Sequence, residues 1–164
     1  MSLIHVPIYP KKCMIKLGGK KPNVTYMQLM EMGLNGCKFD NPAKNYEGMQ
    51  GIYGWIGITN GRKFFLYIGE TIDLKRRSGE YVVNRSRATD TIGSGTNLKI
   101  NFLIESFVEY RLWPFDKPRQ ENSIEFMIFT TEGYTHKERL FLEKSLIEHY
   151  DPPWNGWKIN PDNE

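Results

Sequence analysis

Residues 51–69 read GIYGWIGITNGRKFFLYIG, two apolar runs separated by Asn60-Gly61. Both runs are rich in β-branched and aromatic residues, which favour strands. Asn-Gly is typical of the two-residue turn between antiparallel strands, because both turn positions need a positive φ. This stretch therefore predicts a β-hairpin with strands over 51–59 and 63–69.

Beyond the hairpin, the pattern predicts helices and one further strand. Thr135 and Glu138 form a capping box at the start of the last predicted helix, and Pro152-Pro153 ends it. The predicted order after the hairpin is a helix from about Asp73 capped by Thr71, a helix over about 98–111, a strand over 123–130 and a helix over about 136–150. The expected fold class is α+β, with a small three-stranded antiparallel sheet flanked by helices.

The 164 residues fit one domain with an appendage. Residues 1–48 are predicted to form an N-terminal extension, with a basic arm over 11–21 and a short helix over about 26–32. Residues 49–157 are the expected main domain, and 158–164 a C-terminal tail.

Charge and composition narrow the classes of function. Residues 1–104 contain 15 Lys/Arg and 7 Asp/Glu, whereas residues 105–164 contain 7 and 12. The basic part indicates a polyanionic partner, although a solvated surface would look the same. No apolar run reaches the roughly 18 residues of a membrane span. With two cysteines and no recognisable signal peptide, we expect a reducing, cytoplasmic location.

A carboxylate stands out in the last predicted helix. At 100° per residue, Leu140, Leu146, Ile147 and Tyr150 share one arc of that helix, and Glu143 lies in the middle of it. Burying a carboxylate without a partner is costly. Its partner could be an arginine such as Arg77, or a hard divalent cation held by oxygen ligands. Helix geometry alone does not decide between them.

Several of these residues resemble a known set. Gly51-Ile52-Tyr53 and Tyr67-Ile68-Gly69 resemble the two signature tripeptides of the GIY-YIG nuclease superfamily. Arg77 follows Tyr67 by ten residues, where that family has an arginine, and Tyr81 follows four residues later. Residues 142–155 resemble the family's metal-ligand helix and terminal asparagine, particularly in its phage and excision-repair members. The resemblance covers about residues 49–157.

The resemblance implies a metal-dependent DNA endonuclease that hydrolyses phosphodiester bonds, either of a phage or restriction type or of a repair or mobile-element type. Glu143 would hold Mg²⁺ or Mn²⁺, and the partner would be double-stranded DNA. The catalytic residues would be Tyr53, Tyr67, Arg77, Tyr81, Glu143 and Asn155. The expected DNA contacts, mainly to phosphates, are Lys63, Lys75, Arg76, Arg85 and Arg87.

Two other functions compete with this interpretation. The chain could be a catalytically inactive nucleic-acid-binding module of the same fold. It could also be a structural protein in which Glu143 forms an ordinary ion pair. The joint presence of two tyrosines, an arginine, a glutamate and an asparagine favours the nuclease, because binding alone needs no metal chemistry.

Overall fold

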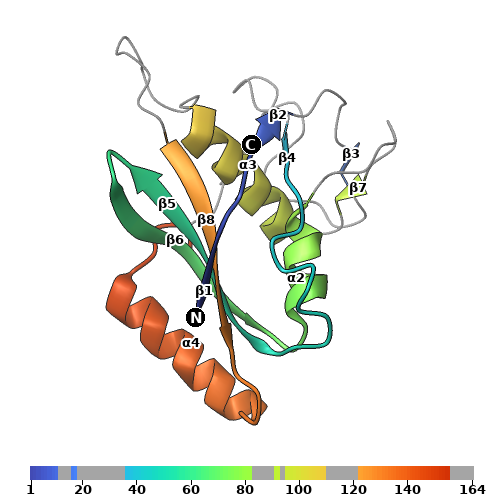
Figure 1. The fold of residues 1–164 in the computed structure, drawn as a ribbon, viewed down its shortest axis with the longest axis vertical. Coiled ribbons are helices and arrows are strands. Elements are labelled where there is room, and N and C mark those ends of the chain that lie inside the picture. Colours follow the sequence, from blue (N-terminus) through green and yellow to red (C-terminus); the bar gives the residue numbers. More distant parts are fainter. Residues whose placement is uncertain (11–15, 18–35, 83–90, 93–94, 110–121, 156–164) are drawn as a thin grey trace, which may run out of the picture. The chain divides into compact units, whose positions relative to one another are not determined.

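The computed structural model describes residues 1–10, 16–17, 36–82, 91–92, 95–109 and 122–155, and Figure 1 shows their helices and strands. The chain divides into two compact units. The first consists of Met1–Pro7, Asp40–Gly79 and Glu121–Trp157, and the second of Ile8–Phe39, Glu80–Gln120 and Lys158–Glu164. Met1–Pro7 belongs to the first unit, where Ser2–His5 pairs with the strand that contains Glu125–Ile128. The division predicted between residues 48 and 49 stays a prediction.

The sheet of the first unit is built on the predicted hairpin. Strands β5 (Gly51–Thr59) and β6 (Arg62–Thr71) pair antiparallel, and β5 also pairs antiparallel with β8 (Asn122–Thr130). The turn residues Asn60 and Gly61 have φ of 50° and 74°, as the Asn-Gly signal requires. The α+β class and the three predicted strands are confirmed.

The sheet has a fourth strand, so the predicted count of three was wrong. Strand β1 (Ser2–His5) pairs antiparallel with β8, which gives the order β1-β8-β5-β6. Four residues are too few to show a period, and their pairing partners lie more than a hundred positions along the chain. The sequence around Ser2 therefore carried no local signal for this strand.

Helix α4 (His136–Tyr150) covers one face of the sheet (Figure 1). Its predicted capping box is present, because the Thr135 side chain accepts from the Glu138 backbone and the Glu138 side chain accepts from the Thr135 backbone. At the other end, Asp151 adopts a left-handed conformation. The predicted bounds of this helix are confirmed.

The inward face of α4 differs in part from the predicted arc. Leu142, Leu146 and Ile147 pack against a core of Ile52, Ile56, Ile68 and Met127. Leu140 and Tyr150, expected inside, are 42% and 50% exposed, whereas Arg139 is only 3% exposed. Charged residues are seldom fully buried unless they are paired, so an arginine in this position was not expected to face inward.

The second unit contains α3 (Gly95–Glu109) and two short strand pairs. Strand β2 (Tyr9–Pro10) pairs antiparallel with β4 (Cys37–Lys38), and β3 (Lys16–Leu17) pairs parallel with β7 (Thr91–Ile92). The Asn101 side chain of α3 accepts from the Cys37 backbone N–H at 3.0 Å and donates to the Cys37 carbonyl at 3.2 Å. Helix α3 begins three residues before the position predicted.

The predicted helix over 26–32, most of the basic arm and the C-terminal tail lie outside the described residues. Among the helices of the described segments, none combines the length and the apolar character that crossing a bilayer requires.

Candidate active site

The hairpin brings Tyr53 over a glycine. Tyr53 on β5 lies opposite Gly69 on β6 and is 2% exposed. A β-carbon at residue 69 would lie 2.5 Å from the Tyr53 phenolic oxygen, a distance that real β-carbons do not show. On its other side the Tyr53 ring stacks on Phe126, with ring centroids 5.7 Å apart. The glycine that ends the second tripeptide is therefore the residue that admits this phenol.

Arg77 reaches the same phenol from helix α2 (Leu74–Tyr81). Its Nε donates a hydrogen bond of 3.2 Å to the Tyr53 hydroxyl oxygen. The Tyr53 oxygen is the acceptor in this contact, so its own O–H does not point at the Arg77 Nε. A phenol from a strand and a guanidinium from the following helix thus meet at one point.

The start of α2 is fixed by Asp73. Its Oδ1 accepts from the backbone N–H of Arg76 at 3.2 Å and from that of Gly48 at 3.1 Å. The hydrogen bond from the Arg76 N–H is the main reason why the pKa of the Asp73 carboxyl lies below its ordinary value. Asp73 is therefore the cap of α2, a correction to the predicted Thr71, whose hydroxyl instead accepts from the Asp73 N–H at 3.1 Å.

Tyr67 lies on the same face of the sheet as Tyr53. It is opposite Trp55, two residues from Tyr53 along β5, and side chains two apart point to one face. The centroids of the two tyrosine rings are 6.3 Å apart. Tyr67 is partly exposed, whereas Tyr53 is buried. This face therefore combines two phenols with the guanidinium of Arg77.

The outer edge of β6 is covered by the residues that follow α4. The Trp154 N–H donates to the Leu66 carbonyl at 2.8 Å. The Asn155 side chain accepts from the Ile68 N–H at 2.9 Å and donates to the Ile68 carbonyl at 2.8 Å. These contacts satisfy backbone groups that an edge strand otherwise exposes. Asn155 thus fixes the strand segment that carries Tyr67 and Gly69.

Glu143, on α4, faces Glu70 near the end of β6. The Glu70 charge is near enough to act on the Glu143 carboxylate. Burial and the Glu70 charge together raise the pKa of the Glu143 carboxyl, and the Glu70 N–H acts in the opposite direction. Glu143 is therefore a half-buried carboxylate whose ionised form gains from a nearby cation.

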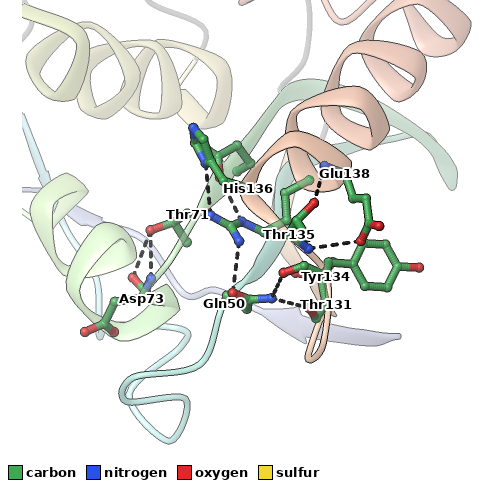
Figure 2. A network of polar contacts seen from close by, with 10 residues as sticks. Gln50, Thr71, Asp73, Thr131, Tyr134, Thr135, His136 and Glu138 are labelled. Carbon is green, nitrogen blue, oxygen red and sulfur yellow. Dashed lines mark hydrogen bonds and ion pairs between the residues drawn. The ribbon is translucent and has the colours of Figure 1, made fainter.

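An arginine that the sequence did not single out lies beside this carboxylate. Arg139 Nε donates to Glu70 Oε2 at 3.2 Å, and a terminal nitrogen donates to Gln50 Oε1 at 2.9 Å. The other terminal nitrogen lies 3.1 Å from His136 Nδ1. Gln50 in turn donates to the Thr131 and Tyr134 carbonyls, as Figure 2 shows. In the sequence, the one signal that could have indicated Arg139 as a site residue is its spacing of four residues from Glu143, which places both on one face of the helix.

The predicted residues therefore form two groups that meet at β6. Tyr53, Tyr67 and Arg77 lie on one face of the sheet. Glu143 belongs to α4, which packs on the other face, and reaches the outer edge of β6. The two groups lie near consecutive residues of β6, because the Tyr53 phenol lies against Gly69 and the Glu143 carboxylate is near enough to Glu70 for the Glu70 charge to act on it.

Of the remaining predicted residues, Tyr81, Lys63, Lys75 and Arg76 lie within the described ranges. Tyr81 is fully buried in the second unit, where its carbonyl accepts from Asn101 at 2.9 Å. Lys63 forms an ion pair of 3.0 Å with Glu125. Of the other predicted DNA contacts, Lys75 lies 3.7 Å from Glu47, and Arg76 is exposed. Arg85 and Arg87 lie outside the described residues.

Within the described ranges, no three or more His, Cys, Asp or Glu side chains gather as a metal site. Near the end of β6, the first unit has two neighbouring carboxylates that could bind a metal ion, Glu143 and Glu70. This donor set fits Mg²⁺, which keeps several waters and is often bound by one or two carboxylates. Comparison with protein families, curated proteins and solved structures finds no match to this chain.

Proposed function

We propose that the chain is a metal-dependent DNA endonuclease of the GIY-YIG type that hydrolyses phosphodiester bonds. The observation that carries this proposal is the 3.2 Å hydrogen bond from Arg77 Nε to the Tyr53 hydroxyl oxygen. The Tyr53 phenol lies against Gly69, and the next residue, Glu70, is near enough for its charge to act on the Glu143 carboxylate. Structural packing alone explains a buried tyrosine. It gives no reason for a guanidinium, two phenols and a half-buried carboxylate to meet at one strand.

Arg77 and Tyr53 would act on the phosphate and on the attacking water. A guanidinium stays charged and presents several N–H donors that match phosphate oxygens. To the Tyr53 phenol, whose oxygen accepts from Arg77, we assign the role of orienting or deprotonating the attacking water. Tyr67, on the same face and partly exposed, would hold the water or the phosphate in place.

Glu143 is the residue that would hold Mg²⁺ or Mn²⁺. When bound, such a cation neutralises phosphate charge and stabilises the leaving oxygen. Asn155 would keep the β6 edge in register with the end of α4 through its two hydrogen bonds to Ile68. These side chains then supply orientation and charge, the two contributions that hydrolysis of a phosphodiester needs most.

The DNA would be gripped through its phosphates. Lys75 and Arg76 lie on α2 next to Arg77, and the long Lys75–Glu47 pair is worth little in water, so phosphate can replace it. Lys63 would have to leave Glu125 to reach DNA. Tyr81, Arg85 and Arg87 remain proposed contributors. The double-stranded DNA substrate and the scarcity of cysteine favour activity in the cytoplasm of a prokaryotic or phage-infected cell.

Supercoiled plasmid DNA provides the test. Wild-type protein is expected to nick or linearise it with Mg²⁺ and to leave it intact with chelator. Glu143→Gln should abolish cutting, whereas Glu148→Gln, an exposed glutamate on the same helix, should cut normally. A gel shift measures DNA binding in parallel. Binding without cutting by wild-type protein would instead support the inactive binding module, and equal cutting by Glu143→Gln would remove the role given to Glu143.

A further inference from the structure

One strand residue faces two successive turns of α4. The side chain of Glu70 accepts from Arg139 at 3.2 Å, and Glu143 lies four residues further along the helix, near enough to Glu70 for the two carboxylate charges to interact. Residues four apart lie on the same helix face. The contacts that place the Glu143 carboxylate therefore include those that Arg139 makes with Glu70.

Arg139 is committed to this arrangement at all three guanidinium nitrogens. Its partners belong to the residue before β5 (Gln50), the end of β6 (Glu70) and the first turn of α4 (His136). With 3% of its surface exposed, the side chain has no room to turn toward solvent. Figure 2 shows Gln50 extending the same network to Thr131 and Tyr134, in the turn before α4. Arg139 thus fixes the position of the helix along the strand.

The charges explain why the arrangement needs a cation. Glu70 and Glu143 are close enough for the charge of one to act on the other. A buried guanidinium on Glu70 offsets one of the two negative charges. It also occupies Glu70 Oε2, which would otherwise be able to ligate a metal ion.

We propose that Arg139 is a positioning residue, which engages the Glu70 carboxylate and so leaves Glu143 as the carboxylate that binds the catalytic cation. This inference rests on the proposed nuclease function and deepens it. It assigns different roles to two adjacent glutamates. Glu143 binds the metal, and Glu70 binds Arg139.

The test is Mn²⁺ binding by the whole chain, measured by calorimetry without DNA. Glu70→Gln keeps an oxygen for Arg139 and is expected to bind Mn²⁺ as wild type does. Glu143→Gln should bind at least roughly tenfold more weakly. Arg139→Met releases Glu70 beside Glu143 and should bind Mn²⁺ more tightly than wild type does, yet cut plasmid at least roughly tenfold more slowly, because Glu143 is no longer held in place.

The double variant Arg139→Met/Glu70→Gln separates positioning from a general loss of structure. Without the released carboxylate, its Mn²⁺ affinity should return to that of wild type. A purely structural arginine would give the same Mn²⁺ affinity in Arg139→Met and in the double variant, which would overturn the inference. Should Arg139→Met fail to fold, Glu70→Gln decides, because a roughly tenfold loss of Mn²⁺ affinity there would make Glu70 a ligand.

The outcomes distinguish this inference from the proposed function. Glu143-dependent Mn²⁺ binding without plasmid cleavage would overturn the nuclease and keep the assignment of the two glutamates. If cleavage depends on Glu143 but Mn²⁺ binding depends equally on the Glu70 side chain, the nuclease function stands and the assignment of the two glutamates is overturned. A wild-type chain that binds no Mn²⁺ would overturn both.

Discussion

The Tyr53 phenol and the Glu143 carboxylate lie against consecutive residues of β6. Tyr53 occupies the space in front of Gly69 where a side chain would begin, and the Glu143 carboxylate is near enough to Glu70 for the Glu70 charge to act on it. The phenol comes from the neighbouring strand and the carboxylate from a helix on the opposite face. Strand β6 is therefore the element through which the two groups of candidate catalytic residues are aligned.

Gly69→Ala should displace the Tyr53 phenol. The added carbon would lie 2.5 Å from both Cζ and the oxygen of the phenol, so the ring or the strand must move. Overpacking of this kind typically destabilises a protein by about 1–3 kcal/mol. Urea denaturation should show that loss, together with slower plasmid cleavage. A variant with unchanged stability and rate would mean that Tyr53 is not confined by Gly69.

Tyr53→Phe should keep the fold and lose activity. The ring still stacks on Phe126, but the oxygen that accepts from Arg77 is removed. Loss of a group that takes part in proton transfer typically slows a reaction by about 10²–10⁴-fold. Single-turnover cleavage measures this rate, with Tyr134→Phe as the control because Tyr134 is partly exposed and remote from Arg77 in the sequence. Equal rates for the two variants would remove Tyr53 from the chemistry.

Asn155→Ala should loosen the edge of β6. The variant leaves the Ile68 N–H and carbonyl without the two side-chain bonds they have now. Losing the partner of a buried polar group costs about 1–3 kcal/mol. Hydrogen exchange at the Ile68 amide should accelerate more than exchange in β1, at the other edge of the sheet. Unchanged exchange at Ile68 would show that Asn155 does not fasten the strand.

Glu143→Gln should stabilise the metal-free protein at neutral pH. Because folding raises the pKa of the Glu143 carboxyl, the folded state holds this proton at a higher pH than the unfolded chain does. The contribution of Glu143 to stability is therefore fully present below its unfolded pKa and is lost as pH rises through the folded value. The amide lacks this dependence. Thermal denaturation across pH, with chelator, should show the gain above the folded pKa, and Mg²⁺ should stabilise only wild type.

Removing Arg77 should slow cleavage without abolishing DNA binding. Arg77→Ala loses the donor to Tyr53 and the proposed phosphate contact. Removal of a single transition-state donor typically costs roughly 10²–10³-fold in rate. Arg62→Ala, an exposed arginine in the hairpin, is the matched control. Cleavage by Arg77→Ala at the rate of the Arg62→Ala control would show that another group holds the phosphate.

Locally encoded features of this chain were predictable. The Asn60-Gly61 turn and the Thr135–Glu138 capping box each depend on residues within a few positions, and both formed as expected. Strand β1 was not predictable, because its partner β8 is distant in sequence. Burial of Arg139 depends on Glu70 and Gln50, which come from other elements. Hydrophobic periodicity shows that a helix position faces inward. It does not show which residue of a distant element will pair with a charged side chain buried there.

The same limit applies to the candidate site. Sequence spacing placed Tyr53 and Tyr67 on one hairpin, and the register puts them on one face. It also placed Glu143 on the inward arc of α4. It did not predict that Glu143 reaches β6 at its edge, nor that Tyr81 belongs to the second unit. Both outcomes depend on how helices pack, which no local pattern encodes.

The most direct test is the cleavage rate of the double variant Tyr53→Phe/Glu143→Gln. If the phenol and the carboxylate act on one phosphate, the second substitution removes little that the first has not already removed. The account predicts a single-turnover rate about equal to that of the slower single variant. A double variant slowed by the product of the two separate losses would show that Tyr53 and Glu143 act independently, and would contradict a shared site at β6.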